Sequence, residues 1–139
     1  MKQKWILYLL TAVLGVLSIL LPVFFQAGLK HYESSLFSLI RDCIEGISMW
    51  SFALLFSTGF VMRFYTKLSG WKIGLATMAL FPVMAILELS VDSTSHNLLP
   101  LEIIMYAIYA IPAIIGAYIG QGVQRITQKK ANLTQAIKK

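Results

Sequence analysis

Length, composition and charge separate this chain from soluble globular proteins. It has 139 residues, of which 58% are hydrophobic and 13% charged, whereas soluble domains carry roughly 25% charged residues. The mean hydropathy of +0.73 excludes a disordered chain, and the single cysteine, Cys43, excludes a fold held together by disulfides.

Four apolar segments predict four membrane spans. Each approaches the roughly 20 residues that an α-helix needs to cross a bilayer, and a helix satisfies its own backbone hydrogen bonds in lipid. The segments cover about residues 5–25, 43–62, 71–91 and 101–120. We therefore expect an all-α fold, in which residues 1–122 form a polytopic four-helix membrane bundle and residues 123–139 form a basic tail.

The basic residues predict the orientation of this bundle. If the chain zigzags, Lys and Arg gather before the first span, between spans two and three, and after span four, while all six acidic residues fall on the opposite side. By the positive-inside rule, both termini are then cytoplasmic. We expect a plasma-membrane protein, or an inner-membrane protein in a bacterium. Orientation accounts for the net charge of +6, so no nucleic-acid partner is expected.

A polar group at the outer end of the bundle is the strongest candidate site. Glu88, Asp92 and His96 are spaced i, i+4, i+8, so they would share one face if the third span continued as a helix. Carboxylates and an imidazole at this spacing could bind a divalent metal or exchange a proton. Asn97 and Glu102 follow in the next connection and at the start of the fourth span.

Two of these carboxylates call for a compensating group. Glu88 and Asp92 end the third span, where the helix dipole disfavours negative charge. Arg41 reaching across from the second span, protonation of Glu88, or a bound cation would each supply the compensation. Glu45 lies four residues after Arg41 and is equally explained by a simple helical ion pair.

The outer candidates also have purely structural interpretations. Glu102 follows Pro100 at the beginning of the fourth span, where a carboxylate favours the helix N-terminus. His96 and Asn97 are equally typical of a solvated loop. A divalent metal at Glu88, Asp92 and His96 therefore stays a hypothesis, and no other cofactor is indicated.

Prolines and small residues mark the third and fourth spans. Pro82 and Pro112 lie at nearly equal depth, and each removes a helical hydrogen bond, which predicts a pair of kinks. Such kinks could form a hinge or a small cavity, or serve only as ordinary curvature. Small residues recur along the fourth span and predict close packing against a neighbouring helix or a second copy: Ala113, Gly116, Ala117 and Gly120. Trp50 is expected in the bundle core, with a platform for lipid or a ligand as the alternative.

Three functions remain open on these patterns. The first is a non-enzymatic accessory or assembly subunit of a larger membrane complex, with an acidic pocket at its outer face. The second is a small oligomeric carrier or channel for a cation or metabolite. The third is an outer-leaflet enzyme that uses Glu88, Asp92 and His96. A non-enzymatic role is favoured, with the bilayer and either a membrane protein or further copies as partners.

Overall fold

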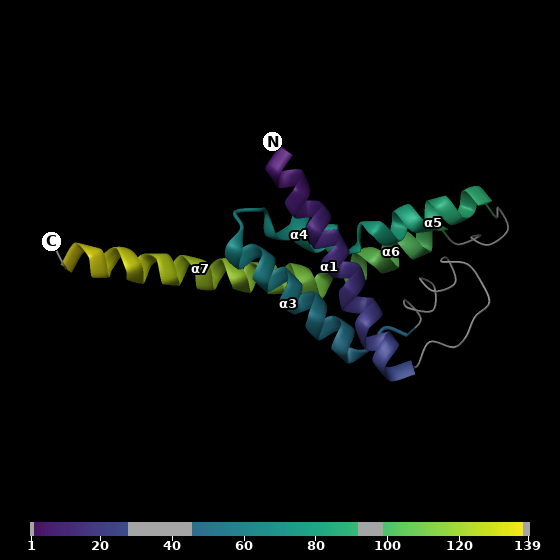
Figure 1. Ribbon diagram of the computed structural model, residues 1–139, viewed down its shortest axis with the longest axis horizontal. Helices are drawn as coiled ribbons and strands as arrows, with labels where there is room; N and C mark the ends of the chain where they lie inside the picture. Colours follow the sequence, from purple (N-terminus) through teal and green to yellow (C-terminus); the bar gives the residue numbers. More distant parts are fainter. Residues whose placement is uncertain (1, 28–45, 92–98, 138–139) are drawn as a thin grey trace.

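The computed structural model describes residues 2–27, 46–91 and 99–137, and the regular structure in these ranges is entirely helical (Figure 1). The helices are α1 (Lys2–Ala27), α3 (Met49–Tyr65), α4 (Gly70–Met78), α5 (Leu80–Val91), α6 (Leu99–Tyr109) and α7 (Ile111–Ile137). The expectation of an all-α fold is confirmed for this part of the chain.

Within the described residues, three helical segments are long and apolar enough to cross a membrane. They are Gln3–Phe25 in α1, Gly70–Leu87 across α4 and α5, and Pro100–Lys130 across α6 and α7. Helix α3 has 17 residues, which at 1.5 Å per residue extends for about 26 Å. The three segments support a membrane protein, and the fourth span remains a prediction.

Helix α3 begins later than the sequence pattern indicated. The second span was expected from about Cys43, but Gly46 lies in a turn and Ser48 is an extended residue that caps a helix starting at Met49. The backbone N–H of Ser48 donates to the Ser51 hydroxyl oxygen at 3.4 Å, and its carbonyl accepts the Phe52 N–H at 3.3 Å. The Ser51 hydroxyl thus satisfies a backbone N–H at the helix start, while the Ser48 side chain makes no capping hydrogen bond.

The two spans that contain Pro82 and Pro112 are interrupted in the structure, whereas α1 continues through Pro22 without a break. The breaks fall at Ala79, between α4 and α5, and at Ala110, between α6 and α7. Because proline has no N–H, Pro82 and Pro112 leave helical carbonyl groups without their usual donor, which weakens the helix on the N-terminal side of each proline. Ala79 donates to the Ala76 carbonyl at 3.2 Å, a tighter turn than an α-helix makes.

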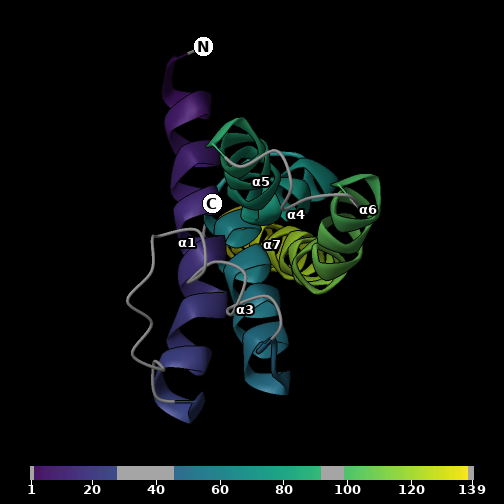
Figure 2. The same cartoon turned by 90° about the vertical axis from the view of Figure 1, so that its right-hand side faces the viewer.

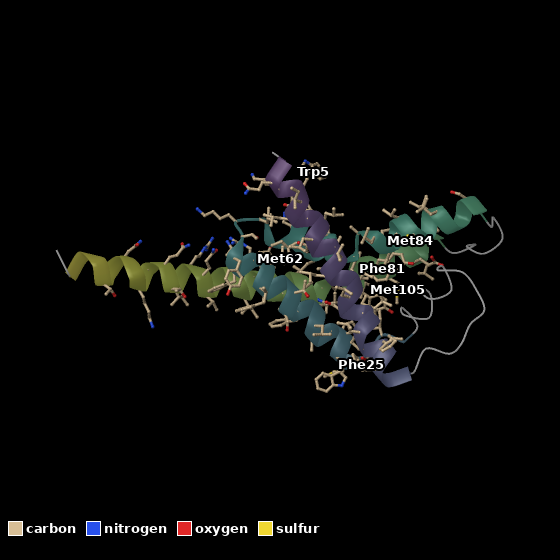
Figure 3. All side chains as sticks on the ribbon, in the orientation of Figure 1. Trp5, Phe25, Met62, Phe81, Met84 and Met105 are labelled. Atoms are coloured by element: carbon tan, nitrogen blue, oxygen red, sulfur yellow. The ribbon has the colours of Figure 1, made fainter. Side chains whose placement is uncertain are left out.

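The helices form two antiparallel pairs that cross each other obliquely. Helices α1 and α3 lie side by side, and the interrupted rods α4–α5 and α6–α7 lie across them (Figures 1 and 2). Helices α5 and α6 reach beyond this crossing on one side, and we call them the α5–α6 arm. Helix α7 extends far in the opposite direction. Figure 3 places Trp5 and Phe25 at opposite ends of α1.

Two clusters of buried apolar residues form the core. The larger joins α1, α3, α5, α6 and the ends of α4 and α7, and consists of Ile19, Val23, Leu55, Met78, Phe81, Ala85, Tyr106, Ala110 and Ala113. The smaller lies where α3 leads into α4 and consists of Met62, Leu68, Ile73 and Ala117. Trp50 belongs to neither, because its side chain is 68% exposed. Its predicted core position is wrong, since bulky apolar side chains on a membrane bundle also face lipid.

Candidate functional site

The predicted outer polar group falls mostly outside the described residues. Asp92, His96, Asn97, Arg41 and Glu45 all lie there. Glu88 is in the last turn of α5, but its side chain is not described. Whether these groups meet therefore stays a prediction.

Glu102 is the member of this group that the structure describes. It lies in the first turn of α6, after Pro100, and its side chain is half-buried. A carboxylate there interacts favourably with the partial positive charge of the helix N-terminus. Across residues 2–27, 46–91 and 99–137, no three His, Cys, Asp or Glu side chains are grouped so that they could hold a metal ion. The triad of Glu88, Asp92 and His96 is not wholly within those ranges.

Close backbone contact between α3 and α7 is the tightest feature of the described structure. A Cβ atom added to Gly59 would overlap the carbonyl oxygen of Ala113, and one added to Gly116 would overlap the carbonyl oxygen of Phe56. At Gly120 the added atom would lie 2.6 Å from the Phe60 carbonyl oxygen. Glycine is required at these crossings because only a missing side chain lets two helix backbones approach so closely.

The small residues singled out on the fourth span are all buried. Ala113, Gly116 and Gly120 face this contact, so helix α7 uses them to pack against α3 of the same chain. Ala117 lies beside Gly70 at the start of α4. The two prolines of the predicted hinge, Pro82 and Pro112, are each half-buried.

A second set of close contacts fixes α4 between α1 and α7. A Cβ atom on Gly15 of α1 would overlap the backbone of Thr77, and one on Gly74 would overlap the side chain of Ile114. The Thr77 hydroxyl donates to the Gly74 carbonyl at 2.6 Å and so satisfies a buried polar group within its own helix. Sequence reasoning missed Gly15, Gly59 and Gly74. The available signal was a glycine inside an apolar helix, and at Gly74 also the spacing of four residues from Gly70.

One hydroxyl pair joins α1 to α3 inside the bundle. The Ser18 and Thr58 hydroxyl oxygens are 3.1 Å apart, and Ser18 also donates to the Leu14 carbonyl at 2.7 Å. Hydrogen bonds of this kind between membrane helices stabilise the pair modestly.

Arg63 and Gln124 form a polar contact between the C-terminal end of α3 and the middle of α7. Arg63 Nη1 donates to the Thr66 carbonyl at 2.8 Å and to Gln124 Oε1 at 2.9 Å. Gln124 Nε2 donates in turn to the Phe64 carbonyl at 2.9 Å. Two carbonyl groups at the end of α3, which have no helical donors, are therefore satisfied by side chains, and the two helices are fixed in register. We call this group the Arg63–Gln124 clamp.

Exposed cations surround the clamp end of the molecule. They lie on α1, on the α3–α4 connection, at the start of α4 and on the C-terminal half of α7: Lys4, Lys67, Lys72, Arg125, Lys129 and Lys130. Lys72 Nζ lies 5.4 Å from the centroid of the Trp71 ring, within the range of a cation–π interaction. The arrangement can attract anions, and it offers no nucleophile or acid–base pair of its own.

Comparison with known proteins identified no relative of this chain. No protein-family model, no curated protein and no solved structure matches this chain.

Proposed function

We propose that the chain is a four-span protein of the plasma membrane, or of a bacterial inner membrane, with both termini in the cytoplasm. Three segments of sufficient length and apolar character support it, and α3 runs antiparallel to α1 as a fourth span would. The orientation rests on the basic residues, because Lys and Arg are retained on the cytoplasmic side.

Within the membrane, we propose a non-enzymatic role as an accessory or assembly subunit. This proposal is supported by where small and large side chains lie in the helix bundle. Small residues fill the helix crossings in backbone contact, whereas bulky apolar side chains point outward. Such crossings leave no passage between α3 and α7 for a solute, and the outward side chains provide a surface for lipid or for a partner's helices. The outer polar group would then be a contact surface for that partner.

The topology is tested with single cysteines in a Cys43→Ser background. Lys67→Cys, on the exposed α3–α4 connection, should react with a membrane-impermeant maleimide only after the cells are opened. Reaction of Lys67→Cys in intact cells would contradict the orientation. A reporter fused after Lys139 should likewise be active only in the cytoplasm.

The accessory role is tested by native electrophoresis of the tagged chain in a mild detergent. We expect migration in a complex with a different polypeptide, at a mass well above 15.6 kDa. Substitution of the outward-facing apolar side chains should abolish comigration with the partner. A matched variant of the exposed tail, such as Gln128→Ala, should still comigrate with it. A stable, folded monomer under the same conditions would contradict this role.

A carrier or channel is the second candidate, and the paired helix breaks favour it. The breaks at Ala79 and Ala110 both lie where the α5–α6 arm leaves the crossing. An arm joined to the rest through two interruptions could rotate as a unit, as gating elements do. Cation flux into proteoliposomes that disappears in Glu88→Gln would support transport. Absence of flux across a panel of cations and metabolites would exclude it.

The enzyme hypothesis depends on Glu88, Asp92 and His96. Metal analysis of the purified protein tests its metal-dependent form, with His96→Ala as the variant that should lose bound metal. A protein without stoichiometric metal would exclude that form.

A further inference from the structure

Helix α7 continues well past the part of it that packs against α3. It runs to Ile137, 17 residues beyond Gly120, which amounts to about 26 Å of helix. We call this C-terminal part of α7 the α7 extension. Its first turn contacts the end of α3 through Gln124, and Figure 1 shows the remainder projecting away from the crossing with no other described helix beside it. A helix this long and unsupported calls for a surface to lie against.

The exposed side chains of the α7 extension are apolar or cationic. Ile126 is 61% exposed and Val123 is 38% exposed, and because they are three positions apart they share a face of the helix, on which Lys130 follows four positions after Ile126. Arg125, Lys129 and Lys130 are also exposed. The sequence contains no acidic residue after Glu102, so nothing in the extension neutralises these cations.

The direction of α7 aims these cations toward the bilayer. Side chains on a helix lean toward its N-terminus, and the N-terminal part of α7 belongs to a segment long and apolar enough to span a membrane. Arg125 lies five residues beyond Gly120, which is about 7.5 Å. That distance is close to the depth of one headgroup layer, roughly 5–7 Å. Lys129 and Lys130 lie about 13.5 and 15 Å beyond Gly120, so they reach back toward this layer only through their long side chains.

The Arg63–Gln124 clamp fixes the start of the extension. Gln124 binds both Arg63 and the Phe64 carbonyl, so the turn that carries Val123 and Arg125 is held against α3. A cationic surface that is already ordered loses little conformational entropy when it binds.

Charge decides among the possible occupants of this surface. A second copy would bring one acid-free cationic helix against another, which is repulsive. The occupant must be anionic, and it must be present where α7 leaves the membrane. The headgroups of anionic lipids meet both conditions.

We propose that the α7 extension binds the anionic phospholipid headgroups of the leaflet from which it emerges. Arg125, Lys129 and Lys130 pair with lipid phosphates, and Val123 and Ile126 enter the interfacial layer. This proposal rests on the membrane insertion proposed above and adds to it a preference for lipid charge.

The test uses the full-length protein reconstituted into vesicles. Cys43→Ser combined with Ile126→Cys carries an environment-sensitive fluorophore. The vesicles contain either phosphatidylcholine alone or equal parts of phosphatidylcholine and phosphatidylglycerol. With phosphatidylglycerol we expect a blue-shifted emission and protection from an aqueous quencher, both reversed by high salt because salt screens the charges.

Variants that remove cations test how strongly the α7 extension docks on the lipid surface. Replacing Arg125, Lys129 and Lys130 by Gln should lower the ratio of docked to undocked extension about fivefold for each cation. The matched control replaces three cations elsewhere on the same end, Lys4, Lys67 and Lys72, by Gln, and should leave the ratio within about twofold of the parent.

The remaining outcomes overturn the proposal in distinguishable ways. Equal exposure of the fluorophore in both lipids, with the protein firmly retained in the vesicles, would refute lipid binding and leave membrane insertion intact. Shielding that depends on protein density and not on lipid charge would show pairing with a second copy instead. Shielding that appears only on adding an acidic protein would assign the surface to that class of partner. A protein that washes off the vesicles would refute the proposed membrane protein itself.

Discussion

The α3–α7 crossing and the α5–α6 arm are built from similarly apolar helices but packed in different ways. At the crossing, Gly59 and Gly116 let backbone touch backbone. The arm contains no glycine, and its two helices meet through larger side chains, with the Phe81 and Tyr106 rings 5.9 Å apart. The comparison teaches that a few glycines, rather than overall hydrophobicity, decide which helices of this chain approach closely. The predictions below test that difference in order of expected effect.

The largest effect is expected at the crossing itself. Gly59→Leu places a side chain where the Ala113 carbonyl lies, so α3 and α7 must separate. We expect a loss of about 4 kcal/mol or more in unfolding free energy, measured by thermal denaturation in mild detergent. The matched control is Gly122→Leu, where an added Cβ meets nothing within 4 Å and the helix should gain about 0.5–1 kcal/mol. Equal behaviour of the two variants would contradict the crossing.

In the α5–α6 arm, we expect removal of a buried side chain, which leaves a cavity, to lower the stability. Phe81 is 3% exposed, and Phe81→Ala should cost about 3 kcal/mol. We expect the largest increase in amide hydrogen exchange in α5 and α6, and a smaller one in α3 and α7, because Phe81 shares the larger core cluster with Leu55 and Ala113. Val83→Ala, a neighbour on the exposed face that is 51% exposed, should change stability by less than about 0.5 kcal/mol. Uniform loss of protection would show that arm and crossing form one cooperative unit.

A smaller effect is expected at the Arg63–Gln124 clamp. Gln124→Ala removes the acceptor for Arg63 Nη1 and the donor to the Phe64 carbonyl. Leaving these half-buried groups unsatisfied should cost about 1–3 kcal/mol, read from the unfolding midpoint in detergent. Gln128→Ala, on the exposed part of α7, should be neutral. If both variants unfolded at the same temperature, the clamp would contribute nothing to the crossing.

The smallest effect is expected for the hydroxyl pair between α1 and α3. A double-mutant cycle of Ser18→Ala and Thr58→Val isolates the coupling between the two hydroxyl groups, whose oxygens are 3.1 Å apart. We expect a coupling of about 0.6 kcal/mol, typical of hydrogen bonds between membrane helices. Ser57→Ala is the control, because Ser57 bonds only within its own helix, to the Ala53 carbonyl, among the described residues. Strict additivity would contradict a direct contact.

The sequence by itself determined the local features of this protein. Long apolar stretches with charged residues only near their ends predicted helices, and the regular structure of the described residues is helical. Hydropathy predicts a helix without reference to the rest of the chain, because each turn satisfies its own hydrogen bonds. Helix ends were less predictable: α3 starts at Met49 because of the polar contacts of Ser48, which an apolar run does not reveal. The outer group around Glu88 and Asp92 remains a prediction from spacing.

Apart from the small-residue face of α7, which the sequence marked, only the tertiary structure decided which face of a helix is inside. A helix that is apolar all round has no periodicity to mark its buried side, so Trp50 was expected inside but lies outside. For the same reason the sequence could not pair Gly59 with Ala113, or Arg63 with Gln124 across 61 residues of chain. Those pairings depend on shape complementarity between distant segments, which exists only once the helices have packed.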